Sequence, residues 1–322
     1  MKFSLELLPN EPIDNLLELI GIAEDIGFEN VWITDHYNNK NVFEILALAA
    51  RETSTIHMGS GVSNPFIRNP VTIAQATTTL DEISNGRALL GIGPGDKATM
   101  NTLGIKWNKP LSAVADAVKL IRDVMDGKEV KNGARLTGTS KVQDNIPIYV
   151  GAQGPKMLEL SGKIADGSLV NASSPKDFEH AMPLIRKGIS NSANPDKDFN
   201  FAAYTACSVD EDKLAAFNQT KIVVAFIIAG APEVVLNRHG ISLESAGMIK
   251  EYLSKNDFKS AVATVDEDMV NAFSVWGTPS QINDKIEVLE SMGVNEFVVG
   301  SPIGKDRVKS LKLLKDVINS FN

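Results

Sequence analysis

Residues 88–97 read Ala88-Leu89-Leu90-Gly91-Ile92-Gly93-Pro94-Gly95-Asp96-Lys97, so a short apolar run passes into three glycines at alternate positions. An uninterrupted apolar run is typical of a strand that is buried on both faces of a parallel sheet. Glycines at the end of such a strand let a ligand approach bare backbone. We therefore expect a flat or anionic ligand at this point; the alternative is a tight strand-to-loop turn without a ligand.

Two common glycine motifs do not fit this stretch. The dinucleotide-binding fingerprint would need a third glycine at Asp96. A P-loop would need Lys and then Ser or Thr directly after the last glycine. Neither a Rossmann-type dinucleotide site nor a P-loop nucleotide site is predicted here.

Strand and helix patterns alternate on both sides of this stretch. Strands are expected at residues 3–8, 29–34, 56–59, 88–93, 147–150, 168–170, 199–207 and 296–299. Helices are expected at residues 13–26, 43–50, 71–83, 111–125, 156–165, 177–188, 213–229, 243–258 and 308–318. Eight strands, each followed by a helix, favour an α/β fold in which a closed (β/α)₈ TIM barrel forms, rather than an open doubly wound sheet.

The chain is expected to form one domain over residues 1–322. Residues 210–278 exceed what one barrel helix needs and are interpreted as a helical insertion before the eighth strand. The apolar run at 223–228 is most simply a buried helix, and a subunit interface is the alternative. No repeat, low-complexity tract or linker divides the chain.

Composition narrows the class of protein. A net charge of −8 and a pI of about 5.2 argue against a nucleic-acid partner. Cys207 is the only cysteine, which excludes an intrachain disulfide and a multi-cysteine metal site and suits a reducing cytoplasm. The first residues lack the apolar core of a signal peptide. The longest apolar run, 222–231, is about half of the ~20 residues that span a bilayer, so no membrane partner is expected.

Reactive groups of such a barrel gather at the carboxyl ends of its strands. Glu6, between Leu5 and Leu7 in the first strand, is expected to point to the interior or the rim pocket. Lost hydration would raise the pKa of its carboxyl and let it act as a general acid. The alternative is an ion pair with a Lys or Arg that only shapes the core.

Asp35 and His36 follow the second strand and resemble part of a triad or a metal site. The other histidines are scattered and no serine lies in a nucleophile-elbow pattern, so a hydrolytic triad is rejected and no metal is expected. Asp35 is expected to accept hydrogen bonds from a bound ligand. His36 is equally well a plain loop residue.

A phosphate group is expected at one of two strand ends. Residues 151–155 lead into a helix whose first N–H groups attract anions. The commoner barrel phosphate site follows the seventh and eighth strands, which would nominate Gly300 and Ser301 instead. An ordinary helix cap is the alternative for either.

Taken together, six segments resemble a known family. They lie, in this order, at residues 8–12, 32–40, 61–65, 91–99, 151–155 and 300–304. The chain resembles the coenzyme F420-dependent methylenetetrahydromethanopterin reductases of methanogenic archaea, which belong to the bacterial luciferase-like superfamily. The resemblance implies an oxidoreductase of methanogenesis that passes a hydride from the 8-hydroxy-5-deazaflavin F420 to methylenetetrahydromethanopterin, giving the methyl form. It also implies a homodimer or homotetramer.

The resemblance also implies roles for particular residues. A non-prolyl cis peptide is expected at Gly61-Val62, behind the deazaflavin ring. Opening the substrate's methylene ring needs a proton, for which Glu6 is the expected donor and Asp96 the runner-up or an orienting partner. Lys97 is expected to contact an acidic tail. The expected coenzyme-binding residues are Thr34, Asp35, Gly61, Val62, Asn64, Gly93, Gly95, Gly151, Ala152, Gln153 and Gly154.

Two other functions stay open at this point. One is an FMN- or F420-dependent luciferase-like oxidoreductase that acts on another substrate. The other is a barrel that binds a pterin or deazaflavin without turning it over. An acid in the interior of the first strand weighs against the binder, because binding alone does not need one.

Overall fold

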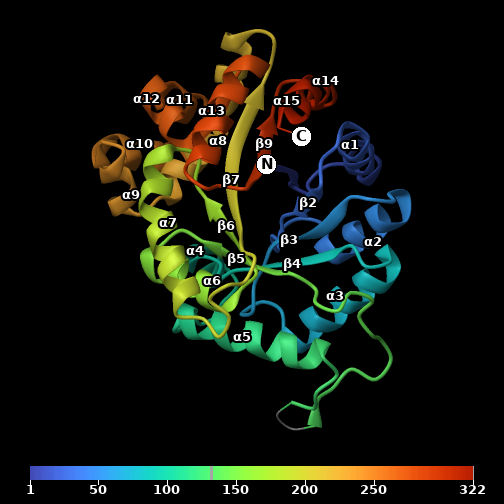
Figure 1. Cartoon of the computed structure of the whole chain (residues 1–322). Coiled ribbons are helices and arrows are strands. Elements are labelled where there is room, and N and C mark those ends of the chain that lie inside the picture. The colour runs from blue at the N-terminus through green and yellow to red at the C-terminus, as the bar shows by residue number, and fades with distance from the viewer. Residues whose placement is uncertain (131–132, 322) are drawn as a thin grey trace. The chain divides into compact units, whose positions relative to one another are not determined.

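The structure, a computed structural model drawn in Figure 1, describes residues 1–130 and 133–321. The chain divides into two compact units. The amino-terminal unit comprises Lys2–Val170 and Ala181–Ala202. The carboxy-terminal unit comprises Met1, Asn171–His180 and Ala203–Asn322. Each unit is described by itself.

The amino-terminal unit is built from alternating strands and helices. Its strands are β1 (Lys2–Leu7), β2 (Asn30–Ile33), β3 (His57–Ser63), β4 (Ala88–Ile92), β5 (Ile148–Ala152) and β6 (Gly167–Asn171). Its helices are α1 (Ile13–Ile26), α2 (Val42–Glu52), α3 (Pro70–Ser84), α4 (Lys97–Thr102), α5 (Pro110–Met125) and α6 (Pro155–Ile164), and α7 (Pro175–Ser190) begins in the other unit. Neighbouring strands in the sequence pair in parallel from β1 to β6. The helices lie outside the strands (Figure 1).

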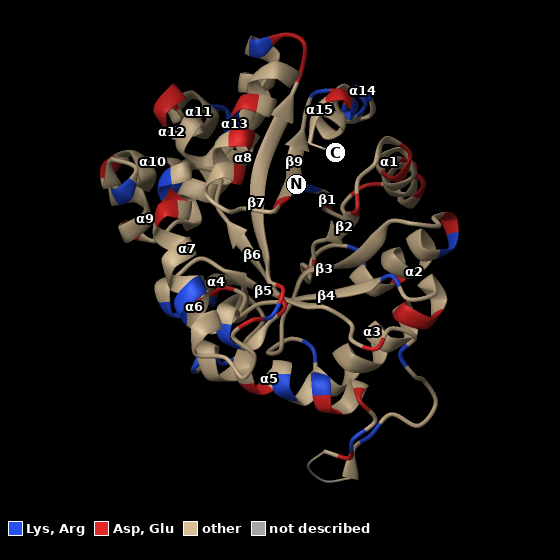
Figure 2. Ribbon diagram, viewed as in Figure 1, with Lys and Arg blue, Asp and Glu red and all other residues tan. Residues whose placement is uncertain are grey.

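Local signals explain where these elements begin and end. The Asn41 and Asn69 side chains accept hydrogen bonds from the first-turn amides of α2 and α3. Gly27, with φ 98°, ends α1 in the left-handed region that suits glycine. Charged residues lie on the outer helices, with only acidic ones on α1 and both signs on α5 (Figure 2). These outward faces leave the apolar faces for packing on the sheet.

Two aromatic rings pack against each other on one face of the β1–β6 sheet. The Trp32 ring on β2 meets the Tyr149 ring on β5 edge to face, with centroids 4.9 Å apart. Strands that are not neighbours touch here, so the sheet curves toward this face. Gly167 pairs with Tyr149 and leaves room for its ring, whereas Gly59, which pairs with Trp32, lies against the backbone of Leu89 on β4. A Cβ at Gly167 would collide with the Tyr149 ring.

The carboxy-terminal unit holds three strands and the remaining helices. The strands are β7 (Asn200–Val209), β8 (Ser274–Gly277) and β9 (Glu296–Ile303). The helices are α8 (Lys213–Gly230), α9 (Glu233–Arg238), α10 (Leu243–Ser254), α11 (Phe258–Thr264), α12 (Glu267–Phe273), α13 (Pro279–Ser291), α14 (Arg307–Leu313) and α15 (Lys315–Ser320). Strand β8 pairs in parallel with β7.

The insertion expected at 210–278 differs from its prediction in two ways. It is not wholly helical, because Ser274–Gly277 forms strand β8. The helix expected at 243–258 is two helices, since Asn256 adopts φ 57° and the Asp257 side chain caps α11 by accepting from the Ser260 amide. A four-residue strand next to helical sequence carries too little periodicity to be recognised.

Helix α8 is the one described helix that is long and apolar enough, by length and composition, to cross a bilayer. A core helix passes the same test, and α8 packs on α10, α11, α12 and β8. Its buried residues are Ala216, Thr220, Val224, Ala225 and Ile228, at helical spacing. The apolar run at 223–228 is therefore partly buried as expected, although Phe226 within it is 54% exposed.

Candidate active site

The carboxyl ends of β1 to β5 gather the residues singled out from the sequence. The register aligns Leu7 with Ile33, and Ser63 with Ile92, so the ends of neighbouring strands lie together. Across these ends the Thr34 amide donates to the Leu7 carbonyl, and the Gly93 amide donates to the Ser63 carbonyl. All thirteen predicted site residues belong to the amino-terminal unit and lie at or next to this edge.

Glu6 is the second-to-last residue of strand β1, next to this edge, and is 6% exposed. It pairs with Trp32, and paired residues of parallel strands point to the same face. Glu6 therefore points to the face on which Trp32 and Tyr149 pack. This is the interior placement that the sequence predicted, and it puts a carboxyl in surroundings with little water.

Strand β3 carries a bulge near its carboxyl end. The register shifts between Ser60 and Ser63, and the peptide bond between Gly61 and Val62 is cis. The hydroxyl of Ser60 donates to the Gly91 carbonyl at 2.8 Å, which ties the start of the bulge to β4. The cis peptide expected from the family resemblance is present at the expected bond.

Glycines on and directly after β4, and on β5, leave space for this bulge. A Cβ at Gly93 would lie 2.6 Å from Cγ2 of Val62, and a Cβ at Gly151 would lie 3.3 Å from both Val62 methyl groups. A Cβ at Gly91 would collide with the Ser60 carbonyl oxygen. The sequence predicted that these glycines clear space for a ligand. The structure instead explains Gly91 and Gly93 by close packing against β3, because every added atom would meet the bulge.

Gly95 and Asn64 form a second close contact at the edge. Gly95 has φ 63°, and a Cβ there would collide with Nδ2 of Asn64. The Asn64 side-chain carbonyl accepts from the Phe66 amide at 2.8 Å, which fixes the turn after β3. Only glycine suits position 95 on both grounds.

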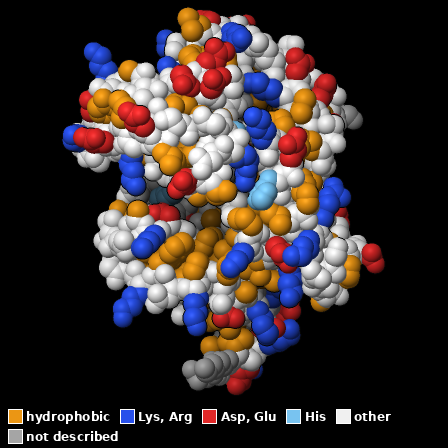
Figure 3. All heavy atoms as spheres, turned by 90° about the vertical axis from the view of Figure 1, so that its left-hand side faces the viewer, with side chains coloured by type: hydrophobic (Ala, Val, Ile, Leu, Met, Phe, Trp, Pro, Cys, Tyr) orange, Lys and Arg blue, Asp and Glu red, His pale blue; other side chains and the backbone are white. Residues whose placement is uncertain are grey.

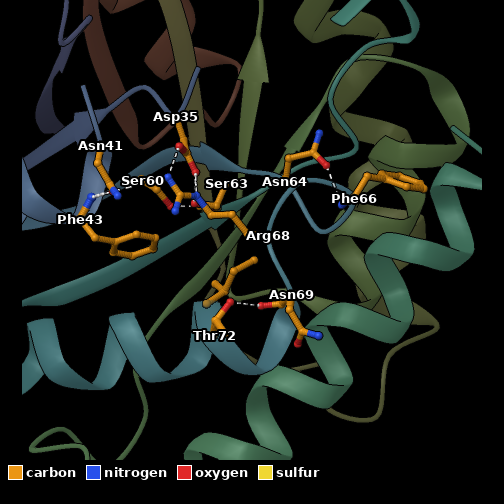
Figure 4. A network of polar contacts seen from close by, with 12 residues as sticks. Asp35, Asn41, Phe43, Ser60, Ser63, Asn64, Phe66, Arg68, Asn69 and Thr72 are labelled. Carbon is orange, nitrogen blue, oxygen red and sulfur yellow. Dashed lines mark hydrogen bonds and ion pairs between the residues drawn. The ribbon is translucent and has the colours of Figure 1, made fainter. Parts of the chain in front are cut away.

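Asp35 is engaged by protein groups (Figure 4). Its Oδ2 accepts from Nε of Arg68 at 2.7 Å and from the Ser63 hydroxyl at 2.8 Å. Its Oδ1 accepts from Nη2 of Arg68 at 2.9 Å. The pair is bidentate, and the bond to Asp35 raises the pKa of Arg68. The expected role of Asp35 as an acceptor for a ligand is therefore less favoured than a role in fixing the edge.

Asp96 is exposed and caps helix α4. Its two oxygens accept from the Thr99 amide at 2.8 Å and the Thr99 hydroxyl at 2.6 Å. Partial burial raises its pKa, but these hydrogen bonds and the nearby His36 outweigh burial and lower the pKa overall. Asp96 is thus an exposed carboxylate that is already engaged by Thr99, whereas Glu6 is buried at the strand edge. Lys97, the first residue of α4, is exposed.

Two features of the edge suit a polar ligand. Thr34 is 7% exposed, and its hydroxyl has no hydrogen-bond partner within residues 1–130 and 133–321. Helix α6 begins at Pro155, its N-cap residue Gly154 provides no side-chain cap, and a Cβ at Gly154 would meet no atom within 4 Å. Free amides in the first turn of a helix attract phosphate. Pro155 has no N–H and the Met157 amide donates to the Gly154 carbonyl at 3.0 Å, so in the first turn of α6 the Lys156 amide is the group that can serve a phosphate. Ala152 and Gln153 lead into this turn, whereas Gly300 and Ser301 lie in the other unit on β9.

The sequence did not predict Arg68 at this edge, and it did not predict that Ser63 pairs with Asp35. Arg68 lies 33 residues from Asp35, and no spacing rule links the two positions. The turn residues Asn64-Pro65 were the one signal that the chain folds back there.

Comparison with known proteins identifies the family. Residues 1–296 match the family model described as luciferase-like monooxygenase. A 5,10-methylenetetrahydromethanopterin reductase of Methanopyrus kandleri is 45% identical, with 100% of this chain and 99% of the relative covered. That of Archaeoglobus fulgidus is 44% identical, with 99% of each chain covered. This chain belongs to the luciferase-like family and, within it, to the 5,10-methylenetetrahydromethanopterin reductases.

The solved structures agree with this placement in the reductase family. The coenzyme F420-dependent tetrahydromethanopterin reductase of Methanopyrus kandleri superposes with a TM-score of 0.91 at 44% identity, over 100% of this chain and 99% of the other. The chain therefore has the (β/α)₈ barrel fold predicted from its sequence. An F420-dependent secondary alcohol dehydrogenase, with a TM-score of 0.80 at 20% identity, shares the fold alone.

Proposed function

We propose that the protein is a coenzyme F420-dependent oxidoreductase that reduces 5,10-methylenetetrahydromethanopterin to the 5-methyl form. The observation that carries this proposal is the full-length identity of 45% and 44% to reductases of that name. When bound, the reduced deazaflavin supplies a hydride from C5. The chain binds the coenzyme and the substrate and donates the proton.

The strand edge fits this coenzyme. The Thr34 hydroxyl, buried and without a protein partner among the described residues, offers a donor and an acceptor to the polar edge of a flat ring. The end of β5 and the turn into α6, at residues 151–154, suit its phosphate, because the N-cap residue Gly154 provides no side-chain cap. Val62, held over the glycines of β4 and β5, supplies an apolar surface for the ring. Gly61, Asn64, Gly93, Gly95, Ala152 and Gln153 complete the proposed coenzyme-binding set, and Asp35 orients it.

Glu6 is the proposed proton donor. The substrate's methylene carbon bridges two nitrogens, and the bond to one of them must break to leave an electrophilic iminium. Protonation of the departing nitrogen by the Glu6 carboxyl drives that step, and the resulting carboxylate stabilises the cation that accepts the hydride. Little water reaches a carboxyl that is 6% exposed, which strengthens this charge interaction.

The remaining proposals concern the state of the protein. We infer one domain over residues 1–322, a cytoplasmic location and a homodimer or homotetramer. No nucleic-acid or membrane partner is proposed, in keeping with the net charge of −8. On the face drawn in Figure 3, Lys and Arg side chains are scattered among acidic and hydrophobic ones rather than joined into one basic surface.

Anaerobic incubation with reduced F420 and methylenetetrahydromethanopterin tests the reaction. The absorbance of oxidised F420 should appear only when both are present with the protein. A protein that instead retains FMN and consumes oxygen would be a monooxygenase, the activity in the name of its family model. Binding of F420 without any oxidation at any salt concentration would favour a non-catalytic binder.

A further inference from the structure

We propose that Arg68 is a positioning residue for the coenzyme: acting through Asp35 and Ser63, it sets where β2 and the β3 bulge present Thr34 and Val62 to the deazaflavin. The proposal rests on the proposed function. Arg68 itself is assigned no contact with coenzyme or substrate.

The Arg68–Asp35 pair holds both side chains in a fixed geometry. Two N–H donors of one guanidinium meet the two oxygens of one carboxylate, at 2.7 and 2.9 Å (Figure 4). The two side chains are 28% and 9% exposed, so water competes little for the carboxylate. The guanidinium also lies 5.5 Å from the centre of the Phe43 ring. Planar, bidentate pairing fixes the carboxylate's orientation as well as its place.

Ser63 connects the fixed Asp35 carboxylate to the β3 bulge. Oδ2 of Asp35, one of the two oxygens fixed by Arg68, accepts from the Ser63 hydroxyl at 2.8 Å. Ser63 is fully buried and ends the bulge, while the Ser60 hydroxyl ties its start to β4. The bulge that carries Val62 is therefore pinned at both ends by serine hydroxyls, and one of them depends on Arg68.

The fixed Asp35 side chain also constrains the end of β2 and the turn after β3. Asp35 directly follows Thr34, so a fixed Asp35 side chain limits how the end of β2 can turn. The Arg68 backbone amide donates to the Asn64 carbonyl at 3.0 Å, so Arg68 is also bonded to the turn that follows the bulge. Thr34, Val62 and Asn64 belong to the proposed coenzyme-binding set. Each is next in sequence to Asp35 or Ser63, the two residues that hydrogen-bond to each other beside Arg68.

A second ion pair in the same unit provides a matched control. Nη2 of Arg122 lies 2.8 Å from Oδ2 of Asp166, with exposures of 27% and 30%. Asp166 accepts from the amide of Ile148, at the opposite, amino-terminal end of β5. Replacing Arg122 weakens a comparable ion pair without touching the strand edge.

The test compares Arg68→Lys, Ser63→Ala and Arg122→Lys in the full chain. Lysine keeps the charge and loses the bidentate geometry. For R68K we expect kcat about tenfold lower, because small displacements of reacting groups cost large factors in rate. The substrate KM should change by less than about threefold, since Arg68 does not bind substrate. The intrinsic isotope effect with C5-deuterated F420 should change, and the fluorescence-measured Kd for F420 should rise about threefold or more.

The other variants make the result decisive. S63A should weaken F420 binding in the same direction, and R68K/S63A should be no worse than R68K, because both changes act through Asp35. R122K should lower Tm as R68K does and leave kcat and the Kd for F420 unchanged. If R68K and S63A change only Tm, with Kd and isotope effect as in the wild type, the proposal is overturned.

The two proposals fail differently. A wild-type protein that binds F420 but oxidises none of it defeats the proposed reaction, while the Kd values of R68K and S63A still decide the role of Arg68.

Discussion

Val62 fits into space that Gly93 leaves for it: a Cβ at position 93 would lie 2.6 Å from Cγ2 of Val62 and 3.7 Å from its Cβ. The bulge of β3 and the glycines of β4 are thus complementary halves of one packing arrangement. Three glycines in a row of alternate positions look like a ligand loop in the sequence. In the structure two of them are required by a neighbouring strand.

Gly93→Ala should destabilise the protein by about 1–3 kcal/mol, the usual cost of overpacking a well-packed region. In a Val62→Ala background the same change should cost under about 0.5 kcal/mol, because the nearest remaining atom is at ordinary contact distance. Denaturant unfolding of the single and double variants measures both values.

Gly91→Ala is the control for this compensation. Its added Cβ would collide with the backbone carbonyl of Ser60, so Val62→Ala should not relieve it. Equal rescue at positions 91 and 93 would show that the effect of Val62→Ala is not specific to its contact with position 93.

Asp96 should behave as a helix cap. Asn caps helices as well as Asp does, so Asp96→Asn should keep the fold and most of kcat, whereas Asp96→Ala should cost about 1 kcal/mol. Because the folded-state pKa of Asp96 is lowered, its carboxylate stabilises the fold above its unfolded pKa, and this contribution is lost as pH falls through the folded pKa. Acid titration of Tm checks the sign. A large loss of kcat in D96N would restore Asp96 as the proton donor.

Lys285 should make stability rise with pH on the alkaline side. Burial lowers its pKa from 10.5 to about 8, and its ammonium donates to the Trp276 carbonyl at 2.9 Å. Between these two values the unfolded chain binds a proton that the folded one does not, so the wild type gains stability relative to Lys285→Met as pH rises. The gain should be at most about 3 kcal/mol. Parallel unfolding curves for the two proteins across pH 8 to 10.5 would contradict this.

Glu6→Gln keeps the shape of the side chain and removes its proton. We expect kcat to fall about 10²–10⁴-fold, the usual range for a lost general acid, while the Kd for F420 changes less than about twofold. Glu18→Gln, on the exposed side of α1, is the control and should match the wild type. Full turnover by E6Q would remove Glu6 from the mechanism.

Much of the fold follows from sequence periodicity. Helix α1 lies at the expected residues, and the ends of most other elements differ by a few residues, because apolar spacing and Asn or Gly boundaries determine them locally. Strand β8 was missed because four residues carry no usable period. Strand β3 proved longer than residues 56–59, since the bulge at 60–63 breaks the alternation that marks a strand.

The site followed from the sequence only where one strand end sufficed. Glu6 was expected to be buried because it lies in an otherwise apolar strand, and it is 6% exposed on the face that Trp32 shares. Asp35 was given a ligand as its partner because Arg68 and Ser63 come close only through the tertiary fold. Long-range hydrogen bonds leave no local trace, so such partners need coordinates.

In the proposed reaction, hydride passes from C5 of reduced F420 to the methylene carbon of the substrate. Anaerobic single turnover with F420 deuterated at the transferred C5 position, followed by mass spectrometry of the product, tests it directly. We expect one deuterium in the methyl group of methyltetrahydromethanopterin for each F420 oxidised. Oxidation of F420 with no deuterium in that methyl group would contradict it.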